Sequence, residues 1–256
     1  MIDDAPLRFA IQQIAQGRSL SQEATAAAFG VVMRGDAGPV QSAALLMGLR
    51  AKGETGPEVA GAAMALRCAM VRLEVEAVDH LVDTCGTGGG QVTTLNISTT
   101  AAFVVAGAGV PVAKHGNRSY TSRSGSADVL EALGVDIRLP RDRVAEVLDS
   151  AGLVFLFAPA YHPAMKHLAD VRKQLAVPTI MNLIGPLANP AGVVRQVIGV
   201  ADPSRGPLLA HALAEGVTDA RQAVFVKEFL NLAEPRAPRR VSAATLQTKT
   251  NTSSGQ

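Results

Sequence analysis

The sequence predicts an α/β protein with a small N-terminal all-helical domain and a larger α/β domain that contains a mostly parallel sheet. Two observations carry this prediction. Residues 1–72 contain helix caps and apolar residues at helical spacing, and no stretch alternates like a strand. Beyond residue 72, short apolar runs end in glycine-rich or polar turns and lead into helical stretches. Such alternation is typical of a parallel sheet with helices packed on it.

Four consecutive helices are expected in the N-terminal domain. The first has apolar residues at helical spacing. Ser19 and Gln22 have the spacing of a capping box before the second helix, and Gly35 is a suitable stop for it. The third helix is expected over Val40–Leu49. The fourth begins at Thr55-Gly-Pro-Glu58, where a cap is combined with proline in the first turn.

Three transitions from strand to turn define the α/β domain, which we place at residues 73–226. They are HLVD into CGTGGG, VPVA into KHGNRS, and GLVFLFA into PAYHPAM. Open parallel sheets bind ligands outside the carboxyl ends of their strands, where these turns would lie. Residues 227–256 have no core pattern, so we expect a divergent, disordered polar tail. The α/β domain is therefore expected to be C-terminally incomplete.

Charge and composition argue against nucleic-acid and membrane partners. Lys and Arg number 24 against 22 Asp and Glu, but six of the cations and only two of the acids follow residue 220, so the body is slightly acidic. Trp is absent, which disfavours a base-stacking surface. The uncharged stretch 84–113 is too polar and too rich in glycine to span a membrane. Cys68 and Cys85 lack C-x-x-C spacing, and together with the absence of a secretory signal they favour a cytoplasmic protein.

The first motif with chemical potential is a glycine loop followed by hydroxyl groups at a helix start. It reads DTCGTGGG at 83–90 and TLNISTT at 94–100. Small residues let the backbone approach an anion closely, and a helix start presents free N–H groups. The combination predicts a cradle for a phosphate or pyrophosphate. The glycines alone fit a tight turn better, and the G-K-[ST] ending of a Walker A loop is missing.

A second motif is the loop Lys114-His-Gly-Asn-Arg118 with the hydroxyl residues that follow it. Two cations, an imidazole, an amide and several hydroxyls lie between a strand and the next helix. Such a loop suits an anionic or oxygen-rich ligand, and a solvated basic turn is the alternative. Taken alone, His115 is expected to bond the backbone rather than act as an acid or base.

Two further segments are less specific. His162 and His167 are five residues apart, which is not the spacing of a zinc site on a helix. Arg172 is either a surface residue or a bidentate clamp on a substrate carboxylate. The segment Asn182–Pro190 contains Gly-Pro and Asn-Pro pairs and predicts a stiff turn with a structural role.

Together, in this order and spacing, the motifs resemble the anthranilate phosphoribosyltransferase family. The segments that carry the resemblance are DTCGTGG, TLNIST, VAKHGNRS, SGSADVLEALGV, HPAMKH, VRK and NLIGPLANP. The resemblance covers about residues 5–220. It implies a transferase of tryptophan biosynthesis that moves the phosphoribosyl group from phosphoribosyl pyrophosphate (PRPP) to the amino group of anthranilate. It also implies Mg²⁺ as a cofactor and a homodimer joined through the N-terminal helices.

The resemblance also implies which residues form the site. PRPP would be bound by Gly86, Gly89, Gly90, Thr94, Asn96, Ser98, Thr99, Lys114, Asn117, Arg118, Ser119, Ser122 and Ser126. Anthranilate would be bound by Gly86, Asn117, His162, Arg172, Gly185 and Pro186. Ser98 would also contact the metal. No general acid or base is assigned, because the amine of anthranilate is already a nucleophile and its alignment matters more.

Two departures from the family pattern leave alternatives open. Gly90 replaces the acid that usually ends the glycine loop, and no adjacent Asp-Glu pair for Mg²⁺ follows the apolar run Gln222–Val226. The abrupt loss of pattern there suggests a truncation or a frameshift. One alternative is therefore a catalytically impaired homologue that binds PRPP or only dimerises. Another is a pyrimidine nucleoside phosphorylase, which has a similar fold and glycine turn.

Overall fold

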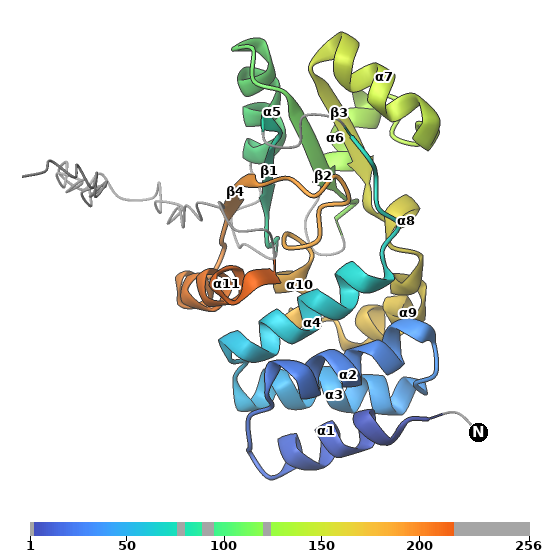
Figure 1. The fold of residues 1–256 in the computed structure, drawn as a ribbon, viewed down its shortest axis with the longest axis vertical. Coiled ribbons are helices and arrows are strands. Elements are labelled where there is room, and N and C mark those ends of the chain that lie inside the picture. The colour runs from blue at the N-terminus through green and yellow to red at the C-terminus, as the bar shows by residue number, and fades with distance from the viewer. Residues whose placement is uncertain (1–2, 76–79, 89–94, 120–123, 218–256) are drawn as a thin grey trace, which may run out of the picture.

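The computed structural model describes residues 3–75, 80–88, 95–119 and 124–217 of the chain. The predicted tail at 227–256 lies outside these residues. The described part consists of a helical layer and a four-stranded sheet, which lies above that layer in Figure 1. The expected fold class, N-terminal helices followed by an α/β unit with a parallel sheet, is confirmed.

The four expected N-terminal helices are present. They are α1 (Ala5–Ala15), α2 (Gln22–Arg34), α3 (Pro39–Lys52) and α4 (Gly56–Ala69). Gly35 ends α2 with φ +82°, a left-handed conformation that glycine adopts without strain. The expected capping box at Ser19 was wrong. The extended residue before the helix is Ser21, and its Oγ accepts a hydrogen bond from the N–H of Ala24 at 3.2 Å.

Glu58 joins the ends of three of these helices. Its side chain is fully buried at the start of α4 and accepts hydrogen bonds from the N–H of Thr55 at 2.8 Å and the N–H of Leu20 at 2.9 Å. Lys52, at the end of α3, places its Nζ 3.0 Å from the same carboxylate. A buried carboxylate requires such partners. One residue therefore fixes the start of α4 against the end of α3 and the segment that leads into α2.

All four strands of the sheet are parallel, in the order β3-β2-β1-β4. The strands are β1 (Val82–Gly86), β2 (Val112–Gly116), β3 (Leu153–Phe157) and β4 (Arg195–Gly199). The other described elements are α5 (Ile97–Gly107), α6 (Ser126–Ala132), α7 (Arg141–Ala151), α8 (Ala158–Tyr161), α9 (Lys166–Leu175), α10 (Ile180–Ile184) and α11 (Gly206–Ala212), with short helical turns at Pro163–Met165, Pro203–Arg205 and Leu213–Val217.

Helices cover both faces of the sheet. Val154 and Leu156 of β3 pack in one apolar cluster with Leu148 of α7, whereas Phe155 packs in another with Leu130 of α6. Successive side chains of a strand point to opposite faces, so α7 and α6 lie on opposite sides of the sheet. The carboxyl ends of the strands point toward the helical layer in Figure 1.

The register of the sheet is uneven. β1 pairs with β4 along five residues, and β2 pairs with β3 along five. The central junction between β1 and β2 pairs only at Val82 and Val112. Beyond that point the two central strands are joined by side chains, as described below.

The strands end later than the sequence pattern predicts. The expected HLVD and VPVA strands would end at Asp83 and Ala113, but β1 and β2 continue for three more residues. These residues were assigned to loops because they are polar, yet Thr84 and Lys114 are buried. β4 was not expected at all. Asn182–Pro190, expected as a stiff turn, begins within α10, and the turn follows that helix.

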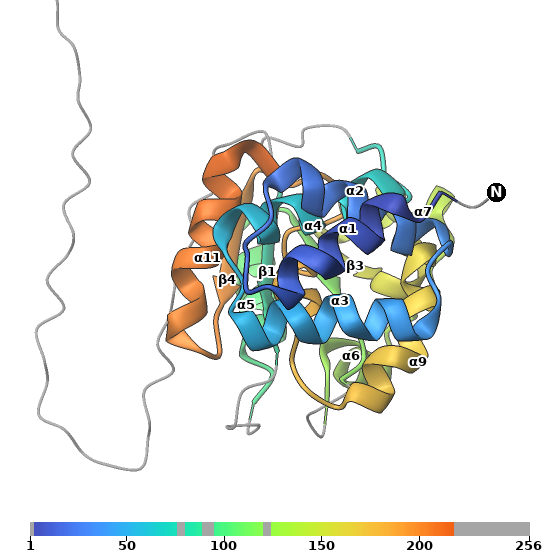
Figure 2. The same cartoon turned by 90° about the horizontal axis from the view of Figure 1, so that it is seen from below.

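The helical layer has one continuous apolar core. It contains residues of α1 to α4 together with Leu168 of α9, Leu183 of α10 and Leu209 of α11. Helices α10 and α11 both pack against α4, and Figure 2 shows α9 and α11 on either side of the N-terminal helices. The layer is therefore built from two separate parts of the chain.

Replacement of Gly61 by alanine should destabilise the protein. A Cβ at this position in α4 would overlap the backbone oxygen of Gln22 and lie 2.8 Å from the Cβ of Thr25, so α2 and α4 would have to separate. Overpacking of this kind costs about 1–3 kcal/mol. Urea denaturation would measure the change in the free energy of unfolding.

Gly30→Ala is the matched control. Gly30 also lies inside a helix, but its added Cβ would meet only the flexible end of Arg34 at 3.5 Å. Since alanine favours a helix over glycine by about 1 kcal/mol, this variant should be as stable as the natural chain or more so. Equal stability of the two variants would contradict the packing described here.

Candidate active site

Several of the predicted PRPP residues meet at the carboxyl ends of β1 and β2. The Nζ of Lys114 donates to the carbonyl oxygen of Thr84 at 2.5 Å and lies 3.4 Å from Ser98 Oγ. The hydroxyl of Thr84 donates to the carbonyl oxygen of Ser98 at 2.7 Å. Lys114 is only 2% exposed. These contacts hold its ammonium between β1 and the first turn of α5.

The predicted anion cradle includes the start of α5. Asn96 precedes the helix, but its amide donates to Ser124 Oγ at 3.3 Å and does not cap the helix. The first turn of a helix leaves backbone N–H groups without intrahelical partners, which attract negative charge. Thr99 lies in this first turn, is 2% exposed, and its hydroxyl has no hydrogen-bond partner among the described residues.

The loop after β2 is folded back on the start of α6. The hydroxyl of Ser126 donates to the carbonyl oxygen of Asn117 at 3.3 Å, and Asn117 Oδ1 accepts from the N–H of Arg118 at 2.8 Å. Gly116 permits this close approach, because a Cβ there would overlap Ser126 Oγ and lie 2.8 Å from the ring of Phe155. The two described ends of the loop are therefore held against each other.

Arg118 and Ser119 bind to α6. The Arg118 guanidinium forms ion pairs with Asp128 at 3.0 Å and Glu131 at 2.6 Å, and its pKa is raised by hydrogen bonds to Glu131 and Asp128. The N–H of Ser119 donates to the Asp128 carboxylate at 3.3 Å. The pKa of Asp128 is lowered, mainly by the hydrogen bond from the N–H of Gly125 and also by the one from the N–H of Ser119. The charge of Arg118 therefore joins the loop to α6 through these two ion pairs.

Two buried histidines lie side by side at the ends of β2 and α8. The Nε2 atoms of His115 and His162 are 3.2 Å apart, and both residues are less than 9% exposed. The expectation that His115 bonds the backbone was thus wrong for its ring. Burial lowers the pKa of His162 to about 4 and lowers the pKa of His115 well below its usual value. Both rings are therefore neutral at pH 7, and one donates to the other.

The other predicted anthranilate residues lie on three elements. Gly86 ends β1, and a Cβ there would lie 3.2 Å from the carbonyl oxygen of Gly199. Gly185 and Pro186 follow α10, and the carbonyl oxygen of Pro186 accepts from Gln196 at 2.7 Å. Arg172 is half-buried near the end of α9, which packs against α2 and α3. The predicted residues Gly89, Gly90, Thr94 and Ser122 lie outside the described residues.

The sequence pattern missed a buried network beneath these residues. The carboxylate of Asp83 is fully buried and accepts hydrogen bonds from the side chains of Asn189 and Gln196, each at 2.9 Å, and from the N–H of His115 at 3.2 Å. Burial raises the pKa of Asp83 and lowers that of Lys114, and the charge of each opposes the shift of the other. The available signal was an acid that directly follows the apolar pair Leu81-Val82.

The described residues do not form a protein metal site by themselves. No group of three or more His, Cys, Asp or Glu side chains among them could hold a metal ion. Ser98, the predicted metal contact, is a single hydroxyl beside the ammonium of Lys114. Mg²⁺ is commonly held by one or two carboxylates together with substrate phosphates, and those carboxylates are not supplied by this part of the chain.

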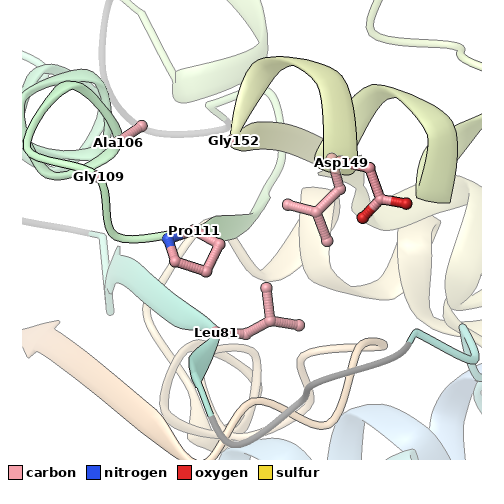
Figure 3. A pocket seen from close by; sticks show the side chains of 7 residues that line it. Leu81, Ala106, Gly109, Pro111, Asp149 and Gly152 are labelled. Atoms are coloured by element: carbon pink, nitrogen blue, oxygen red, sulfur yellow. The ribbon is translucent and has the colours of Figure 1, made fainter.

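A hollow of about 280 Å³ opens at the other end of the sheet, beside the amino ends of the strands (Figure 3). Leu81, Pro111 and Gly152, which line it, directly precede β1, β2 and β3. It is mainly apolar, and its one carboxylate belongs to Asp149 of α7. None of the predicted site residues lines it, so the candidate site remains at the carboxyl edge.

The chain matches the two parts of one family. Residues 8–70 match the helical bundle domain of the glycosyl transferase family, and residues 78–253 match its a/b domain. The chain belongs to this glycosyl transferase family. The second match includes most of the segment that we expected to be a divergent tail.

Curated relatives of this chain are anthranilate phosphoribosyltransferases. The protein of Bradyrhizobium sp. (strain ORS 278) is 53% identical over 194 residues, which cover 76% of this chain and 57% of the relative. The protein of Moorella thermoacetica is 49% identical over 222 residues, which cover 86% and 64%. This chain thus spans less than two thirds of the length of either relative.

Solved structures similar to this chain carry the same name. The crystal structure of the Thermus thermophilus protein has a TM-score of 0.75 and 45% identity, and the match covers 80% of this chain and 62% of that one. The Saccharomyces cerevisiae protein in complex with PRPP and Mg has a TM-score of 0.78 and 27% identity, covering 87% and 66%.

The neutral histidine pair predicts a loss of stability in acid. Between pH 6.5 and about 4, residue 162 binds a proton in the unfolded chain but not in the folded one, so the free energy of unfolding falls as the pH falls. The fall attributable to this residue is on the order of 3 kcal/mol. Urea denaturation at pH 7 and pH 4.5 should show a smaller fall for His162→Gln than for the natural chain.

The exposed His80 supplies the control for this measurement. His80→Gln also removes an imidazole, but from the surface, and at pH 7 it should unfold with the same free energy as the natural chain. An equal fall in the natural chain and in His162→Gln would show that burial of this ring does not govern acid stability.

Proposed function

We propose that this protein transfers the phosphoribosyl group of PRPP to the amino group of anthranilate. The observation that carries the proposal is the ammonium of Lys114, fixed between β1 and the first turn of α5 where two predicted anion-binding loops begin. The names of the curated relatives, at 49% to 53% identity, support the same reaction. The reaction belongs to tryptophan biosynthesis.

The chemistry requires stabilisation of a leaving anion. A C–N bond forms at the anomeric carbon while the C–O bond to pyrophosphate breaks, and the amine loses a proton. Negative charge therefore develops on pyrophosphate, and Lys114 together with the positive end of the α5 dipole can stabilise it. The attacking amine needs alignment rather than a strong base. We assign that alignment to Asn117, His162, Arg172, and the turn at Gly185 and Pro186.

We further propose that Mg²⁺ enters with PRPP, bound mainly through pyrophosphate oxygens, with Ser98 as a protein contact. The yeast relative, whose solved structure is a complex with PRPP and Mg, supports this. Since the described residues do not supply a metal site, we assign no step of the reaction to the metal. What the ion would add when bound is charge neutralisation on pyrophosphate.

The expected homodimer and cytoplasmic location also remain proposals. Phe9 of α1 and Met64 of α4 are large apolar side chains that are 51% and 39% exposed. In the proposed homodimer, both would lie in the interface on the N-terminal helices. No described helix is long and apolar enough to cross a membrane.

Binding of PRPP without turnover is a second candidate function. It is the alternative left open by Gly90, which stands where the glycine loop of the family usually ends in an acid. The two candidates separate in one experiment, in which the protein is incubated with PRPP, Mg²⁺ and anthranilate while anthranilate fluorescence is followed. Loss of fluorescence that requires both PRPP and protein supports transfer. Binding of PRPP by calorimetry with no such loss supports the second candidate.

Lys114→Met should weaken PRPP binding at least tenfold, because a charged hydrogen bond to the ligand is lost. Isothermal titration calorimetry would measure the dissociation constant, and circular dichroism would verify the fold. Lys173→Met, which removes an exposed cation from α9, is the matched control and should bind PRPP like the natural chain. Equal affinity of both variants would remove Lys114 from the site.

A further inference from the structure

The central junction of the sheet is held together in an unusual way. In a regular parallel pair, the register that begins at Val82 and Val112 would continue with direct backbone hydrogen bonds. Here the pairing of β1 with β2 stops at that first position, although both outer junctions continue for five residues. The buried backbone groups beyond it must still find partners.

Side chains supply those partners. The N–H of His115 donates to Asp83 Oδ1 at 3.2 Å, and the carbonyl oxygen of Ala113 accepts from Asn189 Nδ2 at 2.9 Å. On the other strand, the carbonyl oxygen of Thr84 accepts from Lys114 Nζ at 2.5 Å. Each bridge places a side chain between the two backbones, so the strands lie further apart than a direct ladder would hold them.

Asp83 is the centre of this arrangement. Its second oxygen accepts from Asn189, which also binds β2, and from Gln196, which lies beside Asp83 in the register of β4. Asn189 is itself oriented, because its oxygen accepts from the N–H of Ala191 at 2.9 Å. Three elements therefore converge on one carboxylate, and the donors that they supply to it are N–H groups.

The widened junction places the proposed anion site. The two anion-binding loops leave the sheet from β1 and β2, and the start of α5 lies over the same ends through the bond between Thr84 and Ser98. Lys114 lies inside the junction and reaches the first turn of α5. A direct ladder would close the space that its ammonium occupies.

We infer that Asp83 is a positioning residue, which together with Asn189 holds the ends of β1 and β2 at the spacing that Lys114 and α5 need to face PRPP. The inference rests on the proposed function for its ligand and on the hydrogen bonds alone for its geometry. Asp83 itself does not touch the ligand. It acts through Lys114 and the two loops.

Asp83→Asn tests the inference at nearly constant shape. In either orientation, the new amide sets an N–H group against an N–H donor, facing Asn189 and Gln196 or facing His115. Calorimetry should show PRPP affinity reduced roughly tenfold or more, with the number of sites per chain unchanged. A purely structural role would instead lower the number of competent sites and leave the dissociation constant as it was, which would overturn the inference.

Two controls separate charge and stability from position. Asp149→Asn removes an exposed carboxylate from α7, and Val144→Ala removes buried methyl groups from the same helix, away from the site. The first should bind PRPP normally, and the second should do so despite a lower melting temperature. Weakened binding in Val144→Ala, equal to that of Asp83→Asn, would attribute the effect to stability and overturn the inference.

A measurement without ligand completes the test. Hydrogen exchange of the His115 amide, followed by NMR, should be at least tenfold faster in Asp83→Asn, and unchanged exchange would overturn the inference. If the natural chain does not bind PRPP, the proposed function fails, while the exchange rate still decides whether Asp83 sets the junction. Should Asp83→Asn not fold, Asn189→Ala removes the bond to Ala113 and carries the same expectations.

Discussion

A carboxylate that water does not reach governs the architecture of this sheet. Burial of Asp83 is tolerable only because each oxygen accepts N–H donors and a cation lies nearby. The donors come from β2, from β4 and from the segment after α10, so these parts of the chain are bound to a single point. Lys114 is in turn buried where the acid opposes the loss of its charge. The polar interior and the proposed anion site are therefore parts of one electrostatic arrangement.

Two kinds of residue have different roles in the proposed site. Backbone groups and short side chains at the start of α5 are suited to contact an anion, whereas the buried acid and amides determine where those groups lie. The histidine pair adds a neutral, uncharged wall on the side of α8. In the proposed function, anthranilate lies beside this wall and its carboxylate is bound by Arg172.

The sequence predicts the elements of this fold better than their limits. Helical spacing and caps identified α1 to α4, since these signals are local. The same reasoning assigned Lys114 and His115 to a loop, because it treats polar residues as exposed and cannot see the acid that pairs with them from another strand. β4 was missed for a related reason: Arg195 and Val197 are exposed, and Gln196 is polar, so no apolar run appears. A local sequence pattern does not show which partners a residue has from distant parts of the chain.

The shared helical core has a consequence for how such chains can be divided. The two family matches meet between residues 70 and 78, which suggests two interchangeable modules. Yet Leu168, Leu183 and Leu209, from the second module, fill the same core as α1 to α4. A recombination event at that boundary would join two halves of a packed interior that had not adapted to each other. Exchange of the N-terminal helices of this chain would therefore have to carry α9, α10 and α11 with them.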